Sequence, residues 1–272
     1  MTSISLPQQR VGGKYKLYST YLADHITEKH FRGKYSVAVI EADPWIRLNE
    51  ESDTGVGKSV YALKTAAAVI HNVLNVDVEE CWETALNLIV FKPTEIVEKV
   101  RLASKLGMKL PVLIWDDAGY WLNKRFWNSP LIKSTIRLLQ VFRPKLSSLI
   151  LTTPQFSELA FGIRERVNVL VRIGGIEQLR DHFNKALNRH VLIERRKVYI
   201  YALGKDELWK NKLIKRKIAE EEVWMYIPDN VYAKYEKLRL SYVREAEKDM
   251  VTAWKLEQKL LQEKLEEPVE ET

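Results

Sequence analysis

The run SDTGVGKS, residues 52–59, constrains the fold of this chain more than any other feature. Glycines at 55 and 57 precede Lys58 and Ser59, and the alanine-rich segment that follows has helical spacing. Glycines let consecutive backbone N–H groups converge on an anion, and the start of a helix adds its partial positive charge. The run therefore predicts a phosphate-binding turn that leads from a strand into a helix.

Short apolar runs and helical segments alternate on both sides of this turn. Strands are expected at residues 36–40, 45–48, 88–91, 111–115, 147–152 and 168–173, and helices at 58–75, 78–87, 93–107 and 129–142. This alternation predicts an α/β fold with three layers, in which helices cover both faces of a mostly parallel sheet. Further strands are expected at 191–203 and 223–227, followed by a long charged helix from 228 to 265.

Composition narrows the class of protein further. Hydrophobic residues make up 46% of the 272 positions, which is enough for a sizeable core. The single cysteine, Cys81, excludes a disulfide framework, and the histidines lack metal-ligand spacing. No apolar stretch approaches the roughly 18 residues that span a membrane, so we expect a cytoplasmic protein without membrane contact. We expect an N-terminal extension at 1–35, a core at 36–203, and a basic segment with a long helix and an acidic tail at 204–272.

Two carboxylates, Asp116 and Asp117, directly follow the apolar run 111–115. An acid at the carboxyl end of a buried strand lies where a phosphate-bound Mg²⁺ and its waters would sit. We therefore expect Asp116, together with Ser59, to hold the metal, and Asp117 to polarise an attacking water. The alternative is that the two acids only cap a loop.

These motifs together resemble the P-loop ATPases of the additional-strand, catalytic-acid branch, and within it the AAA+ group that contains DnaA and the DnaC/IstB helicase loaders. The resemblance covers roughly residues 45–175, and VLIWDDAG resembles the acidic motif of DnaA- and DnaC-like members. It implies that ATP and Mg²⁺ are bound by Ser52, Asp53, Thr54, Gly55, Val56, Gly57, Lys58, Ser59 and Val60. Ser52 departs from the family pattern, which has a glycine at that position.

Two later stretches resemble functional segments of the same family. LSSLILTTPQFSEL resembles the sensor-1 strand, whose polar residue contacts the γ-phosphate or the attacking water; of Thr152, Thr153 and Gln155 we choose Thr153. FGIRERVNVLVRI resembles the segment that carries an arginine finger, which implies a homo-oligomer with ATP at the subunit interface. The finger is Arg166 or, failing that, Arg164, and the alternative is that both arginines belong to a solvated helix end.

Beyond residue 175 no run reads as the helical lid of this family or as the helix-turn-helix of DnaA. A stand-alone ATPase with its own C-terminal part is similar to the DnaA-like ATPases of archaeal viruses and plasmids, including the spindle-shaped viruses. A viral protein of this kind would work in the host cytoplasm. We expect the long helix to pack against the domain or a sister subunit through an apolar stripe formed by Tyr235, Leu238, Tyr242, Ala246, Met250, Trp254, Leu261 and Leu265.

The net charge of +7 is concentrated in one segment. Residues 177–217 hold twelve Lys and Arg against five acids, an excess that equals that of the whole chain. Such a block predicts a surface for the phosphate backbone of DNA, although lysines on a solvated face also serve solubility. The aromatic and basic run GYWLNKRFWN, residues 119–128, either stacks nucleic-acid bases or packs against the following helix, and we favour packing.

The combined interpretation is an oligomeric, nucleic-acid-associated ATPase that acts in DNA replication initiation or helicase loading, with a replicative helicase as a candidate partner. The alternative role is that of an FtsK/HerA-like DNA translocase or a viral genome-packaging ATPase. A third class is an interaction protein that is gated by nucleotide and has negligible turnover. Measurement of ATP turnover with and without DNA separates these classes.

Overall fold

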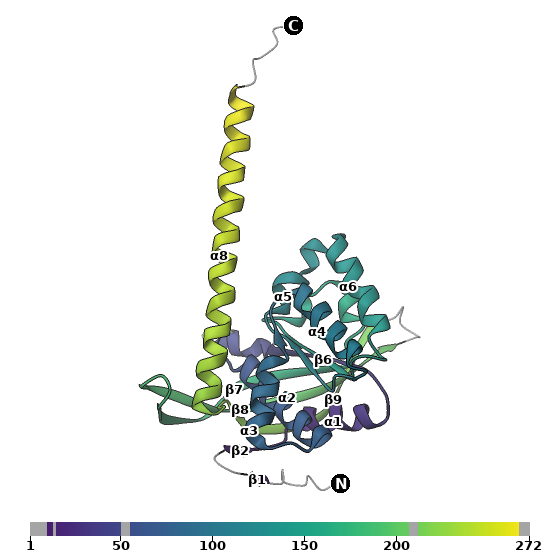
Figure 1. Ribbon diagram of the computed structural model, residues 1–272, viewed down its shortest axis with the longest axis vertical. Coiled ribbons are helices and arrows are strands. Elements are labelled where there is room, and N and C mark those ends of the chain that lie inside the picture. The colour runs from purple at the N-terminus through teal and green to yellow at the C-terminus, as the bar shows by residue number, and fades with distance from the viewer. Residues whose placement is uncertain (1–9, 13–14, 50–54, 207–211, 267–272) are drawn as a thin grey trace. The chain divides into compact units, whose positions relative to one another are not determined.

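A computed structural model describes residues 10–12, 15–49, 55–206 and 212–266 of the chain. The chain divides into two compact units, residues 1–231 and 232–272, and each is described by itself. The first unit is built on a seven-stranded sheet with the order β4-β5-β6-β3-β7-β8-β9 (Figure 1). Its strands are β3 (Ser36–Ala42), β4 (Ile89–Val90), β5 (Leu113–Trp115), β6 (Ser148–Thr152), β7 (Val169–Asn184), β8 (Arg189–Asp206) and β9 (Lys212–Trp224).

Five of these strands, from β4 to β7 in sheet order, are parallel, and β8 and β9 extend the sheet in antiparallel fashion. β3, β5 and β6 are buried along their whole length. Strands that are covered on both faces have to be apolar throughout, which is why their sequences show no alternation. One strand, β6, lies between β3 and β5, so the strand before the glycine turn and the strand before Asp116 are not neighbours.

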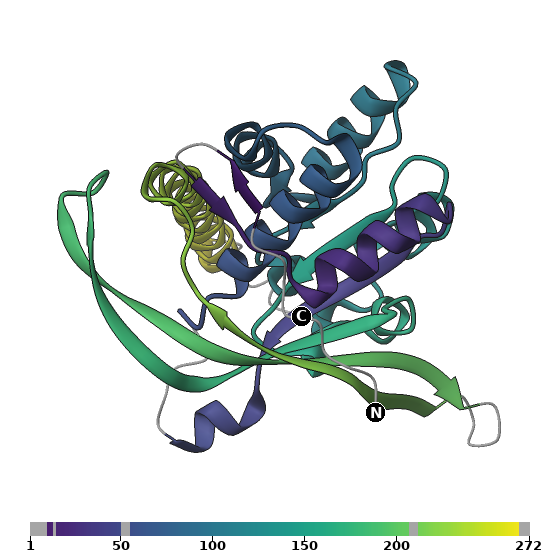
Figure 2. The same cartoon turned by 90° about the horizontal axis from the view of Figure 1, so that it is seen from below.

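Helices cover both faces of the parallel strands, as Figures 1 and 2 show together. They are α1 (Tyr21–Phe31), α2 (Lys58–Leu74), α3 (Val78–Asn87), α4 (Pro93–Lys105), α5 (Ala118–Trp121), α6 (Pro130–Val141) and α7 (Phe161–Arg164). α2 packs against β3, β5 and β6 and has α1 and α3 beside it. Its small side chains at 66–68 allow this close approach, and residues 61–70 are all buried. The predicted three-layer α/β fold with a mostly parallel sheet, additional C-terminal strands and a long helix is confirmed.

Short elements complete the first unit. They are the hairpin β1 (Arg10–Gly12) and β2 (Tyr15–Leu17) and the 3₁₀ helices η1 (Pro44–Asn49), η2 (Lys124–Phe126) and η3 (Phe156–Glu158). The strand expected at 45–48 is wrong, because these residues form η1. Asp43 starts this turn, since its Oδ1 accepts from the N–H of Trp45 at 3.1 Å and its carbonyl accepts from Ile46 at 3.0 Å.

The strand expected at 168–173 was predicted to stop before Gly174-Gly175, but β7 continues through both glycines to Asn184. The register against β8 shifts on either side of Ile176, as in a β-bulge. A Cβ on Gly174 would lie 3.1 Å from the carbonyl oxygen of Lys197, so the missing side chain lets the two strands approach closely. The glycines therefore bend a long strand, and they do not end it.

β7, β8 and β9 form the long, curved antiparallel ribbon of the sheet, which Figure 2 shows. The strand expected at 191–203 lies within β8, which is longer at both ends. The strand expected at 223–227 is wrong for most of its length, because β9 ends at Trp224 and extends back to Lys212.

The long helix α8 (Asp229–Glu266) confirms the helix predicted from 228 to 265, and most of it forms the second unit. Several side chains of the predicted apolar stripe are exposed, namely Leu238, Met250 and Trp254. The partner of this stripe stays a prediction. Among the described residues, no helix combines the length and the apolar character needed to cross a membrane.

Candidate functional site

The glycine turn has the backbone conformation that its sequence predicts. Gly55 and Gly57 have φ values of 80° and 87°, a left-handed region that favours glycine. Gly57 precedes α2, and its carbonyl accepts the first helical bond from Tyr61 at 2.8 Å. Lys58, Ser59 and Val60 consequently form the first turn of α2, with Val56 buried before them. The predicted ligands Ser52, Asp53 and Thr54 lie outside the described residues.

Asp116 ends the buried strand β5 and lies against the first turn of α2. Its side chain is fully buried, and its Oδ1 accepts hydrogen bonds from Ser59 Oγ at 2.8 Å and from Thr152 Oγ1 at 2.6 Å. The glycine turn and the acidic strand end, 57 residues apart in the sequence, are therefore adjacent in space. Both hydrogen bonds come from neutral hydroxyl groups, which stabilise the buried charge but do not neutralise it.

Asp117 turns the chain away from the sheet at this point. It has a φ of 51° and precedes α5, and its backbone N–H donates to Thr152 Oγ1 at 2.9 Å. A left-handed conformation is unusual for a residue other than glycine and often marks a site where geometry matters more than local strain. Thr152 thus accepts from Asp117 and donates to Asp116, and it fixes both acids with one hydroxyl group.

The three polar candidates after β6 have different surroundings. Thr153, chosen from the sequence, is fully buried, and its Oγ1 donates to the carbonyl oxygen of Gln155 at 3.2 Å. A Cβ on Gly119 would lie only 2.3 Å from that same Oγ1, so Thr153 packs against the first turn of α5. Thr152 is the candidate that contacts the acidic strand end, and a sensor role for Thr153 stays a prediction.

The residues at this strand end fit a magnesium ion. Mg²⁺ prefers oxygen ligands and is usually held by one or two protein groups, with water and phosphate oxygens completing its shell. The Ser59 hydroxyl and the Asp116 carboxylate are such oxygen groups, and they lie within hydrogen-bond distance of each other. Groups of three or more acidic, histidine or cysteine side chains that could enclose a metal do not occur in the described part of the chain.

The two candidate finger arginines lie between α7 and β7. Arg164 ends α7, with its guanidinium carbon 5.6 Å from the centre of the Phe161 ring, and Arg166 lies three residues before β7. The Nε atoms of both arginines are buried without a hydrogen-bond partner in the structure. β7 begins opposite Ala38, near the amino end of β3, so Arg166 lies toward the amino ends of the parallel strands. Ser59 lies at their carboxyl ends, next to Asp116.

Met225, just after β9, packs on the outside of the glycine turn, which the sequence patterns did not predict. A Cβ on Gly57 would lie 2.7 Å from Met225 Cγ, so this glycine is needed for its contact as well as for its φ value. The backbone of Met225 is held in turn by Glu194 of β8, whose carbonyl accepts from its N–H at 2.7 Å. The antiparallel strands are therefore in direct contact with the turn.

A buried polar cluster also connects α2 with β9. Lys64 Nζ donates to the carbonyl oxygen of Trp224 at 2.8 Å, and Tyr61 Oη donates to Glu221 Oε1 at 2.6 Å. Burial lowers the pKa of Lys64 to about 8, although Glu221 acts in the opposite direction, and burial raises the pKa of Glu221. A lysine in the middle of an alanine-rich helix gives no sequence signal of this role.

The basic segment 177–217 is distributed over β7, β8 and β9, and much of its charge is paired. Arg196 is 4% exposed and pairs with Glu194 at 2.6 Å. The other described pairs are Arg195–Glu222, Lys197–Glu177 and Lys217–Glu220. Glu220, Glu221 and Glu222 lie just past the counted block, and they reduce its excess of seven positive charges to four. Lys215, Arg216 and Lys217 are exposed and keep a basic strip on β9.

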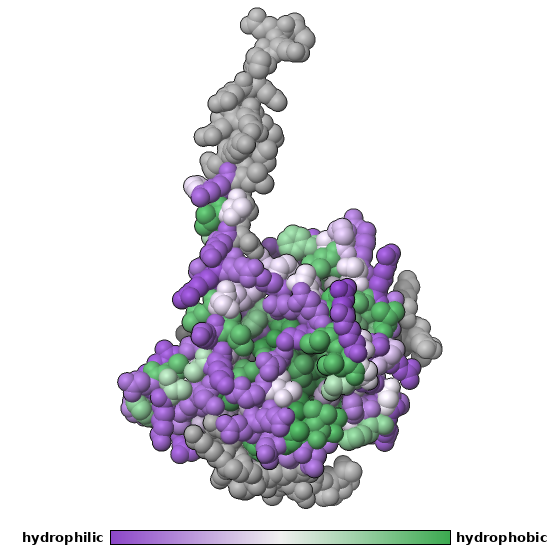
Figure 3. Space-filling view, in the orientation of Figure 1, coloured by the Kyte–Doolittle hydropathy of each residue, from purple (hydrophilic) through white to green (hydrophobic). Residues whose placement is uncertain are grey.

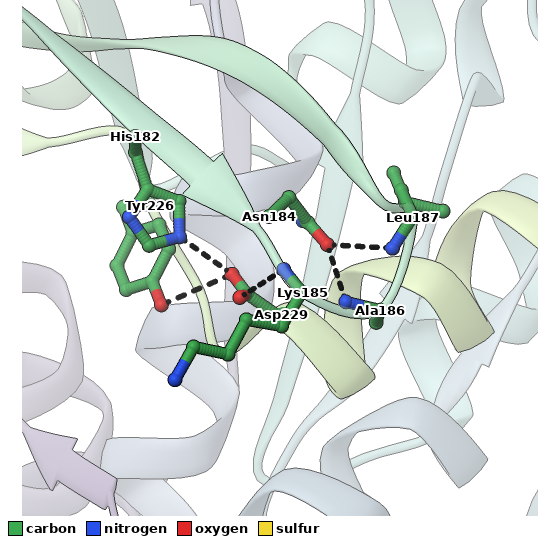
Figure 4. A network of polar contacts seen from close by, with 7 residues as sticks. All are labelled: His182, Asn184, Lys185, Ala186, Leu187, Tyr226 and Asp229. Carbon is green, nitrogen blue, oxygen red and sulfur yellow. Dashed lines mark hydrogen bonds and ion pairs between the residues drawn. The ribbon is translucent and has the colours of Figure 1, made fainter.

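A polar network holds the far end of the β7–β8 hairpin (Figure 4). Asp229 Oδ1 contacts His182 Nε2 at 2.8 Å and accepts from Tyr226 Oη at 3.3 Å, and its Oδ2 accepts from the Lys185 N–H at 2.9 Å. Burial alone would raise the pKa of Asp229, but these hydrogen bonds outweigh burial and lower it. Asn184 closes the turn by accepting from the N–H groups of residues 186 and 187. His182 therefore anchors the hairpin.

Comparison with known proteins gives two viral relatives and no match to a protein-family model. The uncharacterized protein B-251 of Sulfolobus spindle-shape virus 1 is 28% identical over 195 residues, which are 69% of this chain and 71% of that protein. The uncharacterized protein ORF286 of Acidianus two-tailed virus is 32% identical over 113 residues, which are 40% and 36% of the two chains. The expected similarity to proteins of archaeal viruses is confirmed, whereas the DnaA-like subtype stays a prediction.

Among solved structures, the N-terminal domain of zonular occludens toxin from Neisseria meningitidis is similar over 69% of this chain and 95% of its own. The sequences are 14% identical and the TM-score is 0.31.

Proposed function

We propose that this chain is a Mg²⁺-dependent ATPase of the P-loop class that acts on DNA as a homo-oligomer. The observation that carries the proposal is the 2.8 Å contact between Ser59, in the first turn after the glycine turn, and the buried Asp116. A hydroxyl group and a buried carboxylate at the N-terminus of a helix form a site for a phosphate together with a divalent cation.

Each described residue of the site has one role in this proposal. The N–H groups of the turn and Lys58 bind the phosphates, while Ser59 and Asp116 hold the metal. Bound Mg²⁺ supplies positive charge that offsets the negative charge on the transferred phosphoryl group. Asp117 orients the attacking water, and Thr152 fixes the positions of both acids through its hydroxyl group.

The position of the arginines supports the proposed homo-oligomer. Arg166 lies toward the sheet edge opposite to Ser59 of the same chain, so as a finger it would act on ATP bound by a neighbouring copy. Arg164, which stacks on Phe161, is the second candidate. Their buried Nε atoms would gain partners when a second copy covers them.

Two biological roles are compatible with such an enzyme, and both involve DNA. The resemblance to DnaA- and DnaC-like ATPases favours replication initiation or helicase loading. One observation favours the alternative of a translocase or a genome-packaging ATPase: between β7 and α8 the described residues form the strands β8 and β9, where the DnaA-like pattern has a helical lid. Strand translocation driven by ATP would identify the second role, and slow turnover with binding to a helicase would identify the first.

Phosphate release from ATP, measured with Mg²⁺ and with excess chelator, tests the proposed chemistry. We expect turnover that depends on the metal, and a decrease of roughly 10²–10⁴-fold for Asp117→Asn with ATP binding retained. Glu79→Gln, which changes an exposed acid of α3, is the matched control. If the wild type and Asp117→Asn both show negligible turnover while they bind ATP, the chain belongs to the nucleotide-gated interaction proteins. Equal and substantial turnover by both would rule out Asp117 as the catalytic acid.

A further inference from the structure

Aromatic side chains project from a well-anchored segment next to the candidate site. Tyr120, Phe126 and Trp127 are 67%, 60% and 66% exposed, respectively. They belong to residues 119–128, for which packing against the following helix was the favoured interpretation. That interpretation is wrong for these three rings. On the face of the molecule seen in Figure 3, hydrophobic residues are interspersed with hydrophilic ones.

The segment that carries these rings is held by its own backbone and by one buried residue. Leu122 is fully buried, and its carbonyl accepts from the N–H of Ala160 at 2.8 Å. Asn123 caps η2 by accepting from the Arg125 N–H at 3.0 Å, and Trp121 Nε1 donates to the carbonyl oxygen of Phe91 at 2.8 Å. The exposed rings therefore project from a fixed support, so this segment of the protein loses little conformational entropy when a ligand binds.

Two cations lie directly beside the rings in the same turn. Lys124 and Arg125 immediately precede Phe126 and Trp127, and both are exposed. Lys124 contacts Glu158 at 3.1 Å, an exposed pair that contributes little to stability and exchanges readily with a phosphate. Single-stranded nucleic acid combines flat bases with a charged backbone. It therefore matches a surface on which rings and cations lie side by side. In a duplex the bases are paired and stacked, so they are not available to these rings.

We propose that Tyr120, Phe126 and Trp127 form a stacking platform for the bases of single-stranded nucleic acid, with Lys124 and Arg125 on its phosphates. The platform is joined to Asp117 by the four residues of α5, so a bound strand is placed to influence ATP turnover. That influence rests on the proposed function, whereas the contact itself does not.

Binding of a labelled oligothymidine of about 16 nucleotides by the full chain tests the platform. We expect Trp127→Ala to weaken binding about tenfold and Trp127→Phe, which keeps a ring, to bind within about twofold of the wild type. Duplex DNA should bind both variants and the wild type equally. Phe31→Ala and Trp254→Ala remove rings that are 66% and 59% exposed elsewhere, and they should leave single-strand binding unchanged.

Three results overturn the proposal. The first is a wild-type chain that does not bind the oligonucleotide, and the second is a Trp127→Ala variant that binds normally while its melting temperature shows that it is folded. The third is a changed molecular mass of Trp127→Ala in light scattering with unchanged DNA affinity, which would assign the rings to a protein interface. ATP turnover without DNA separates the two proposals: wild type that binds the strand through Trp127 but hydrolyses no ATP sinks only the proposed function.

Discussion

The parallel and the antiparallel halves of the sheet both contain ion pairs, but at the end of β5 the parallel half also places a buried carboxylate beside hydroxyl groups. On the parallel strands, Asp116 is fully buried and accepts hydrogen bonds from the neutral hydroxyl groups of Ser59 and Thr152. On the antiparallel strands the described charges pair with each other, as in Arg195–Glu222 and the buried Arg196–Glu194. A buried carboxylate next to a hydroxyl group at the start of a helix offers oxygen ligands to a cation, whereas the two charges of an ion pair compensate each other. The difference separates a site for chemistry from a surface.

The two halves are also in contact, because the end of β9 packs against α2 and the glycine turn that precedes it. Met225 packs against Gly57, and Lys64 donates to the carbonyl oxygen of Trp224. The antiparallel half therefore supports the site mechanically, while its own charges remain satisfied. Four predictions test this contrast, and each compares a variant with the wild type or with a control variant.

The largest effect is expected when the buried carboxylate of Asp116 is made neutral. Asp116→Asn keeps an oxygen that accepts from Ser59 and Thr152, but it removes the negative charge that binds a metal. We expect ATP turnover to fall by roughly 10²–10³-fold, the range seen when one electrostatic group of an active site is removed. Asp181→Asn removes an exposed acid of the β7–β8 hairpin, which contacts His190 at 2.8 Å, and should leave turnover unchanged. An equal loss in both variants would contradict the contrast.

The next effect distinguishes two adjacent threonines. Thr152→Val removes the hydroxyl group that connects Asp116 with the Asp117 N–H, and leaves two buried groups without this partner. We expect turnover to fall about tenfold, and the free energy of unfolding to decrease by about 1–3 kcal/mol. Thr153→Val loses only a bond to a backbone carbonyl, and its turnover should stay within about twofold of the wild type. The reverse result would restore Thr153 as the sensor.

These threonines illustrate what the sequence can predict and what it cannot. The apolar run before them predicts a buried strand, and the acids after residues 111–115 predict a site at the strand ends; the structure brings these groups together. Successive side chains of a strand point to opposite faces, however, and a fully apolar strand shows no alternation that would assign a face to either threonine. Only the register of β6 against β5 decides that Thr152 contacts Asp116.

The antiparallel half was harder to predict because its signals are polar and long in range. Gly174-Gly175 resemble a strand end, but they form a bulge that depends on the approach of Lys197. Pro44 resembles a strand start, but Asp43 forms a turn there, because its side chain accepts from the N–H of Trp45 and its carbonyl accepts from Ile46. The basic block was counted only to residue 217, and its partners Glu220 and Glu222 follow directly. Each error concerns a contact that a local pattern does not contain.

A smaller effect is expected at the junction of the two halves. The folded-state pKa of Lys64 is about 8, below its ordinary value of 10.5, so between these values the unfolded chain binds more protons. The free energy of unfolding contributed by this group therefore increases as the pH rises from 8 toward 10. Lys64→Met lacks the titrating group but keeps the Tyr61–Glu221 bond. Chemical denaturation of both proteins at pH 8 and 9.5 should show a difference that grows in favour of the wild type. A difference that is constant or that shrinks would contradict the buried position of the ammonium group.

The smallest effect is expected on the exposed ribbon. Arg195 and Glu222 are each 40% exposed, and exposed pairs of this kind contribute at most about 1 kcal/mol. Glu222→Gln should therefore leave the free energy of unfolding nearly unchanged, but it releases one cation on strands that we expect to lie near a phosphate backbone. Affinity for duplex DNA at low salt should increase about twofold, and the gain should disappear as the salt concentration rises. Glu79→Gln on α3 makes the same change of net charge away from the ribbon. If both variants gain affinity equally, the ribbon has no special role and the attraction comes from the total charge of the chain.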